Sequence, residues 1–165
     1  MKPSERFDSL VAYYAERAGL PADLIKRQMM AESSGNPSAK SQCGAQGLLQ
    51  LMPVTANEMG CVDPYNPDQN LRAGTEYLAR QRASVQLLLH GHTVDEQDIL
   101  RLALASFNCG YGYIRVAIKM ALELGQPITW GVISGHLPKA VVRGRVADLK
   151  QVNGYIERIL PPPQV

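Results

Sequence analysis

Apolar residues recur at helical spacing from the start of this 165-residue chain. Phe7, Leu10, Val11 and Tyr14 fall at i, i+3, i+4 and i+7, the spacing that places side chains on one face of a helix. Ser4 is of a type that caps helix N-termini. Gly19 interrupts the pattern. The spacing therefore predicts a first helix that begins near Ser4 and ends at Gly19.

A second helix is predicted from Pro21 to about Glu32. Proline is tolerated best at the first helical position, and Asp23 in the first turn suits the positive end of the helix dipole. Ile25, Met29 and Glu32 share one stripe of this helix. Residues 33–47 are rich in glycine, proline and small polar side chains without a period, which is typical of a loop.

The middle and the end of the chain also read as helices. A long helix is predicted over 66–89, where Leu71, Leu78 and Val85 lie seven apart, and Gly91 stops it. Another opens at Thr93 or Asp95 and runs to Asn108. Two more are predicted, one after Gly112 that Gly125 ends and one before the Pro161–Pro163 tail; their apolar faces are formed by Ile114, Ala117, Ile118, Ala121 and Leu122, and by Leu149, Val152, Ile156 and Ile159.

No element is assigned around Trp130 and Pro138, and the chain contains no convincing strand and no internal repeat. The fold class expected is all-α. A chain of this length fits one domain, so we expect a single domain over residues 1–165.

Composition and charge narrow the classes of protein. The apolar share of 45% and the charged share of 19% are typical of a folded globular chain. A net charge of +2 is too small to indicate nucleic acid as a partner, although the last quarter is locally basic. No apolar run approaches the roughly 18 residues of a membrane span, so membrane insertion is not expected.

The three cysteines allow at most one disulfide, and that possibility stays open. Their spacing, and the absence of a Cys/His pattern, give no indication of a metal site. We therefore expect no metal and no cofactor.

Glu32 is the first candidate for chemistry. It lies at a helix end, on an otherwise apolar stripe, directly before a glycine-bearing loop. Burial there would raise its pKa and keep the carboxylic acid protonated, as glycosidic bond cleavage requires. Most helix-end glutamates are simply solvated, so the position alone does not decide between the two interpretations.

The surrounding residues favour the chemical interpretation. Residues 31–37 read AESSGNP and residues 47–53 read GLLQLMP. This pair resembles the signature of the soluble lytic transglycosylase (SLT) family, which is goose-lysozyme-like: a catalytic Glu-Ser and then Gly-Leu-Met-Gln-Leu-Met-Pro. Leu49 stands where the family usually has Met, a change that conserves volume.

Further matches follow in the family's order and extend to position 155. Residues 70–78, NLRAGTEYL, are similar to the family's Asn-Ile-x-Ala-Gly-x-x-Tyr-Leu helix, and residues 105–110, ASFNCG, look like its Ala-Tyr-Asn-Ala-Gly element. Tyr155 resembles the family's late groove tyrosine. The resemblance implies an all-α, lysozyme-like domain with a substrate groove that binds peptidoglycan glycan strands.

Carried over residue by residue, the resemblance implies that Glu32 is the acid/base and that Ser33 helps to orient or polarise it. The residues implied to line the sugar groove are Gln50, Tyr77, Phe107, Asn108 and Tyr155.

Plainer interpretations exist for several of these residues. Ser33 suits a polar helix terminus, Gln50 and Asn108 suit a satisfied turn, and Tyr77 suits packing. The apolar residues of the motifs are expected in the core: Leu51, Met52, Leu71 and Leu78.

Phe107 departs from the family pattern, which usually has tyrosine at this place. The missing hydroxyl would have to come from elsewhere, and Tyr111 and Tyr113 are the nearby candidates.

Hydrolytic lysozymes generally need a second carboxylate, and this chain has no Asp or Glu between Glu32 and Glu58. The family route needs only one. Glu32 would protonate the glycosidic oxygen and then accept the proton of the muramic acid C6 hydroxyl, which closes a 1,6-anhydro ring.

The sequence leaves two alternatives. One is a muramidase that hydrolyses the same bond, if Asp63 or Asp68 reaches the groove. The other is a non-catalytic peptidoglycan-binding module whose site has decayed.

The N-terminus lacks the pattern of a secretory signal. We expect a monomer that acts on the cell wall. Because the signal pattern is absent, the chain is expected to be either a phage endolysin released through a holin or a trimmed domain of an exported protein.

Overall fold

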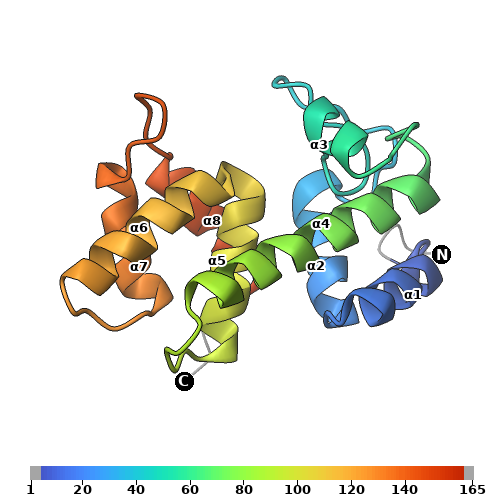
Figure 1. Ribbon diagram of the computed structural model, residues 1–165. Helices are drawn as coiled ribbons and strands as arrows, with labels where there is room; N and C mark the ends of the chain where they lie inside the picture. Colours follow the sequence, from blue (N-terminus) through green and yellow to red (C-terminus); the bar gives the residue numbers. More distant parts are fainter. Residues whose placement is uncertain (1–4, 162–165) are drawn as a thin grey trace. The chain divides into compact units, whose positions relative to one another are not determined.

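A computed structural model describes residues 5–161, which form α-helices joined by loops; within that range the only β-type pairings are isolated bridges (Figure 1). The chain divides into two compact units, one up to Ala79 and the other from Arg80. The division lies within one long helix, α4 (Pro67–Leu88). The expectation of a single domain over 1–165 stays a prediction.

The first unit contains α1 (Asp8–Ala18), α2 (Ala22–Ser33), α3 (Pro53–Glu58) and the first part of α4. Helices α1 and α2 pack against each other. The core of this unit is formed by side chains that are almost completely buried: Val11, Leu24, Ile25, Met29, Leu48, Leu49, Leu51, Leu71 and Leu78.

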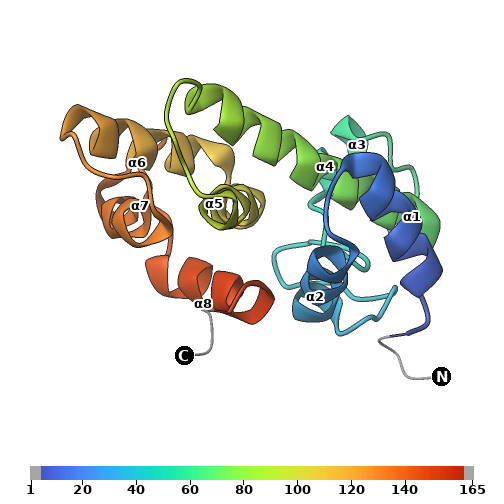
Figure 2. The ribbon, with the colours of Figure 1, turned by 90° about the horizontal axis from the view of Figure 1, so that it is seen from below.

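The second unit contains the rest of α4, α5 (Glu96–Cys109), α6 (Tyr111–Glu123), α7 (Trp130–His136), the short 3₁₀ helix η1 (Leu137–Lys139) and α8 (Leu149–Ile159). Helix α6 packs against both α5 and α7, and α8 packs against α5. Both views show α7 alongside α6 (Figure 2).

The periodic segments are confirmed as helices, with small differences at their ends. Pro21 is the residue before α2 rather than its first residue, a shift within ordinary end uncertainty. Asp95, not Thr93, caps α5, because its carboxylate accepts a hydrogen bond from the Gln97 amide at 2.8 Å. Gly19 ends α1 in the left-handed conformation. The predicted cap Ser4 lies outside the described residues, as does the tail beyond Pro161.

The core prediction is right for three motif residues and wrong for one. Leu51, Leu71 and Leu78 are buried, but Met52 is 44% exposed. Met52 directly precedes α3 and has an extended backbone, so its side chain points away from the buried neighbour Leu51.

In the described part of the chain, no helix is long and apolar enough to cross a membrane.

All three cysteines are free thiols, and they differ in accessibility. Cys43 is exposed and Cys61 is buried, while Cys109 is half-buried. Burial raises the pKa of Cys61, and it raises the pKa of Cys109 to about 11. The thiolate is the nucleophilic form, so both thiols are protonated and unreactive near neutral pH.

We therefore expect iodoacetamide to modify Cys43 first in the native protein, with about one label per chain by intact mass, and all three cysteines in urea. Reactivity of Cys109 should rise only as the pH approaches its pKa. The variant Cys43→Ser is the control and should stay unlabelled; rapid labelling of this variant near neutral pH would contradict the packing around Cys61 or Cys109.

Candidate functional site

Glu32 lies in the last turn of α2 and is half-buried. The preceding residues on this face, Ile25, Gln28 and Met29, are buried. After Glu32 the chain leaves the helix sharply, because Ser34 (φ 54°) and Gly35 (φ 74°) both adopt left-handed backbone conformations. The carboxyl group is therefore held where the apolar face of a packed helix meets a tight turn.

Ser33 is the last residue of α2. Its hydroxyl donates to the carbonyl oxygen of Met29 at 3.1 Å, one helical turn back. That bond uses the hydroxyl hydrogen, so in this conformation Ser33 does not donate to another group. The arrangement matches the plainer interpretation of Ser33 as a polar helix end.

The loop after Glu32 is joined to the GLLQLMP segment by hydrogen bonds centred on Ala39. The Ala39 carbonyl accepts from the Gly47 amide at 2.9 Å and from Gln50 Nε2 at 3.2 Å. Gln50 Nε2 also donates to the Gly47 carbonyl at 2.9 Å. The two motif segments around Glu32 and Gln50 are therefore parts of one structure.

Both amide hydrogens of Gln50 are used in this way. The residue itself has a left-handed backbone (φ 47°) within a turn that mutual backbone bonds between Gln46 and Leu51 close. Gln50 can therefore meet a ligand only through Oε1, as an acceptor.

Asn70, buried in the first part of α4, holds this turn in place through hydrogen bonds. Its Oδ1 accepts from the Leu49 amide at 2.8 Å. Its Nδ2 donates to the carbonyls of Gln46 at 3.0 Å and Pro64 at 2.8 Å. One side chain thus satisfies three backbone groups of two loops, each of which would be costly to leave unpaired in a buried place.

Two glycines allow the turn to approach α4 this closely. Gly47 has φ 79°, and a Cβ there would overlap the Pro64 carbonyl oxygen and the Asn70 carboxamide. At Gly74, in α4, a Cβ would lie 2.9 Å from the Leu49 Cβ. The family-like pattern of glycines and Asn70 therefore has a direct packing explanation.

The two candidate second acids are engaged elsewhere in this unit. Asp63 Oδ1 accepts from the Tyr65 amide at 3.0 Å, which is an Asx turn. Asp68 Oδ1 accepts from the Tyr14 hydroxyl at 2.7 Å, so it ties α4 to α1. Burial, followed by this bond, raises the pKa of Tyr14.

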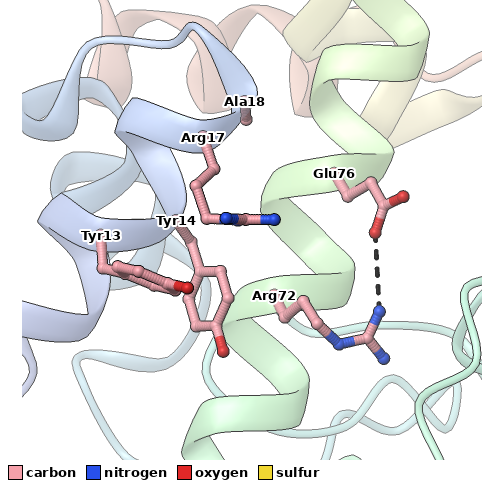
Figure 3. A pocket seen from close by; sticks show the side chains of 6 residues that line it. All are labelled: Tyr13, Tyr14, Arg17, Ala18, Arg72 and Glu76. Carbon is pink, nitrogen blue, oxygen red and sulfur yellow. Dashed lines mark ion pairs between the residues drawn. The ribbon is translucent and has the colours of Figure 1, made fainter.

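A pocket of about 360 Å³ lies between α1 and α4. Figure 3 shows Tyr13, Tyr14 and Arg17 from α1 opposite Arg72 and Glu76 from α4. Arg72 is bound within its own unit, at 3.5 Å from Glu76 and 2.9 Å from the Gly60 carbonyl. These two contacts hold Arg72 on α4 and on the preceding loop, whereas the bond between Tyr14 and Asp68 links α1 to α4.

Tyr77, the remaining predicted site residue of the first unit, is half-buried in α4. The second unit holds the other three. Phe107 and Asn108 are half-buried at the end of α5, and Tyr155 is 2% exposed in α8, the helix that packs on α5.

Asn108 carries an unusual acceptor. Its Oδ1 is buried, and no hydrogen-bond donor reaches it from residues 5–161. Buried acceptors are rarely left unpaired, and those that are need an explanation such as a ligand or water. The satisfied-turn interpretation is thus not supported for this oxygen.

The two tyrosines that could replace the hydroxyl absent at Phe107 differ in their surroundings. The Tyr111 hydroxyl donates to the Ser84 carbonyl at 3.1 Å, and burial raises its pKa. Tyr113 instead lines a pocket with Gly110 and Gly112. Of the two, Tyr113 is the one whose hydroxyl has no bond within the described chain.

The structural role of Asn70 at the site was not predicted from the sequence. Its signal was present, because Asn70 opens the NLRAGTEYL match, but the partners are 6, 21 and 24 residues away. Among the described residues, no three His, Cys, Asp or Glu side chains are grouped so that they could hold a metal ion.

Several bacterial proteins are similar to this chain. It is 36% identical over 163 residues to the membrane-bound lytic murein transglycosylase F of Desulfosudis oleivorans, which covers 94% of this chain and 35% of that protein. It is also 36% identical over 116 residues to the protein of the same name from Vibrio parahaemolyticus, covering 70% of this chain and 21% of the relative. The chain thus spans about a third or less of these relatives' length.

Solved structures share the fold. The lytic transglycosylase Slt of Pseudomonas aeruginosa, in an inactive glutamate-to-glutamine mutant, aligns with a TM-score of 0.69 at 22% identity, covering 95% of this chain and 23% of that one. The 70 kDa soluble lytic transglycosylase of Escherichia coli aligns with a TM-score of 0.68 at 23% identity, with the same coverage of both chains. The all-α, lysozyme-like fold class is confirmed.

The sequence model of one protein family, described as the transglycosylase SLT domain, matches residues 9–126. This stretch contains Glu32, the Asn70-bound turn and the end of α5. The chain therefore belongs to the transglycosylase SLT domain family.

Proposed function

We propose that this chain is a peptidoglycan lytic transglycosylase that cleaves the β-1,4 bond between N-acetylmuramic acid and N-acetylglucosamine and leaves 1,6-anhydro ends. The observation that carries the proposal is a family-type Glu32 at the end of a packed helix, followed by a loop that is hydrogen-bonded to the turn fixed by Asn70. No other acid lies between Glu32 and Glu58. The similarity to proteins named lytic murein transglycosylases supports it.

In this reaction Glu32 acts twice. Its carboxylic acid first gives a proton to the glycosidic oxygen as the bond to the muramic acid C1 breaks, and the N-acetylglucosamine leaves with a free C4 hydroxyl. The positive charge that develops at C1 is stabilised by the substrate's own N-acetyl group.

The second step restores the acid. The muramic acid C6 oxygen bonds to C1 and its proton passes to the Glu32 carboxylate. No water is consumed. Because the C6 hydroxyl belongs to the same sugar, its high effective concentration takes the place of a second carboxylate.

Other site residues serve binding in this proposal. Gln50 Oε1 is an acceptor, while the unpaired Asn108 Oδ1 requires a donor such as an N-acetyl N–H or a sugar hydroxyl. The half-buried rings of Tyr77 and Phe107 are available to contact sugars, whereas Tyr155, at 2% exposure, offers a ligand little surface. Ser33 reaches Glu32 only if it leaves the Met29 carbonyl.

The hydrolytic alternative needs a second carboxylate close to the sugar. Asp63 and Asp68 were the candidates, but one closes an Asx turn and the other binds the Tyr14 hydroxyl of α1. Their engagement favours the transglycosylase over the muramidase.

The products distinguish the two reactions. We expect purified cell wall digested with this protein to give anhydro-muropeptides by mass spectrometry, 18 Da lighter than their hydrolysed counterparts because one water (about 18 Da) is not added, and no new reducing ends. A hen-type muramidase digest is the control for reducing products.

Predominantly reducing products would contradict the proposal and show that the protein is a muramidase. Binding to the wall without release of any fragment, in a zymogram and a pull-down, would favour the non-catalytic module.

We further propose that the protein acts at the bacterial cell wall in the periplasm, as a monomer. The relatives' name includes murein and their source organisms are bacteria. The wall is the site of action in both settings expected from the sequence, phage lysis and an exported enzyme.

A further inference from the structure

A tight turn carries two arginines between η1 and α8. The Val142 amide donates to the Arg145 carbonyl at 2.8 Å, and the Arg145 amide donates back to Val142 at 3.0 Å. The two central residues, Arg143 (φ 51°) and Gly144 (φ 76°), are both left-handed, as in a type I′ turn. This conformation suits glycine or asparagine and is unfavourable for an arginine. Backbone strain that glycine or asparagine would relieve is often retained at functional sites.

The turn borders a pocket of about 560 Å³ at the start of α6, lined by Gly110, Gly112, Tyr113, Val142, Arg143 and Arg145. A Cβ on Gly112 would lie 3.4 Å from Val142 Cγ1, so the glycine keeps the space between α6 and the turn open. Tyr113 adds a ring to one wall.

The pocket is positively charged without compensation. No carboxylate lines it, and neither arginine forms an ion pair with any residue from 5 to 161. The first turn of α6 contains no acidic residue, and its N-cap Gly110 has no side chain to cap the helix. The positive end of the helix dipole adds to the two guanidinium charges.

The location of the pocket suggests its ligand. Gly110 follows Asn108 by two residues, and the unpaired Asn108 Oδ1 marks that end of α5 as a binding position. If a glycan strand lies there, its sugars are neutral, and the anions it carries are the carboxylates of the peptides attached to muramic acid. Arginine binds carboxylates in a bidentate geometry.

We propose that Arg143 and Arg145 form a subsite for the stem-peptide carboxylates, so that the enzyme prefers strands whose peptides carry free carboxylates. This inference rests on the proposed function, because it takes the polymer to be peptidoglycan. It assigns to the second unit a selectivity that the sugar-binding residues do not supply.

The test compares native sacculi with sacculi whose carboxylates have been coupled to methylamine by a carbodiimide. The variant is Arg143→Asn with Arg145→Gln, since asparagine tolerates the left-handed position. We expect this double variant to lose about tenfold in initial rate on native sacculi, a typical effect of removing charged hydrogen bonds, and less than about twofold on amidated sacculi. The unmodified protein should lose a similar factor when the sacculi are amidated.

The matched control is Lys119→Gln with Lys150→Gln, which removes the same charge from exposed positions outside the pocket. Co-sedimentation with both kinds of sacculi measures binding independently of cutting, and thermal melting confirms that each variant is folded.

Each outcome decides the proposal. An equal loss on native and amidated sacculi, no loss on either, or an equal loss in the lysine control would overturn it. If the unmodified protein cuts neither substrate, the proposed function fails, and co-sedimentation still shows whether the arginines select free carboxylates.

Discussion

Replacement of Glu32 by glutamine should reduce cleavage of purified cell wall by at least about 100-fold, while binding to the wall and the melting temperature stay close to those of the unmodified protein. General acid and base catalysis together contribute roughly 10²- to 10⁴-fold, and glutamine can neither donate the proton nor take it back. The amide is similar in shape to the acid, so the half-buried end of α2 can keep its packing. Release of soluble muropeptides measures the effect.

Glu58→Gln is the matched control, because it makes the same chemical change at the next acid along the chain, an exposed residue at the end of α3. This variant should retain full activity. Comparable wall clearing by Glu32→Gln would contradict the assignment of the acid.

Replacement of Gly47 by alanine should lower the free energy of unfolding by about 2 to 5 kcal/mol. The alanine would have to adopt a left-handed backbone conformation. Its Cβ would also overlap the Pro64 carbonyl oxygen and the Asn70 carboxamide. The backbone strain costs about 1 to 2 kcal/mol, and the displaced buried hydrogen bonds cost about 1 to 3 kcal/mol more. For a chain of this size the melting temperature should fall by roughly 4 to 20 °C in a thermal scan.

Gly44→Ala separates the two causes. Gly44 lies in the same loop with φ 90°, but a Cβ there would have no atom within 4 Å. We expect a loss of only about 1 kcal/mol from the backbone alone. Equal losses in both variants would show that the close approach to Asn70 contributes nothing.

The sequence was a good guide to the helices that have several turns and one buried face. The spacing of Leu71, Leu78 and Val85 predicts the long helix α4, and these three side chains are fully buried. Helices α3 and α7 were not predicted because their six and seven residues are too short to show a period.

Parts of the site depend on contacts between residues far apart in the chain, and these were not predictable. Glu32 and Gln50 could be identified from motifs. The neighbouring sequence, however, does not indicate that the side-chain amide of Gln50 donates a hydrogen bond to the Ala39 carbonyl. Met52 was placed in the core because it is an apolar residue of the motif, whereas its extended backbone turns the side chain outward. The Arg143–Gly144 turn lacks any hydrophobic period, so its proximity to α6 appears only in three dimensions.

The bond between Asn70 and the turn also limits how the sequence can diverge. Asparagine at this place both accepts from Leu49 and donates to two carbonyls, and aspartate, leucine or alanine would each leave at least one of these groups unsatisfied. Any side chain larger than hydrogen at position 47 would push into the same carboxamide. A side chain at position 47 is therefore compatible only with a smaller residue at position 70 and a displaced Pro64 carbonyl.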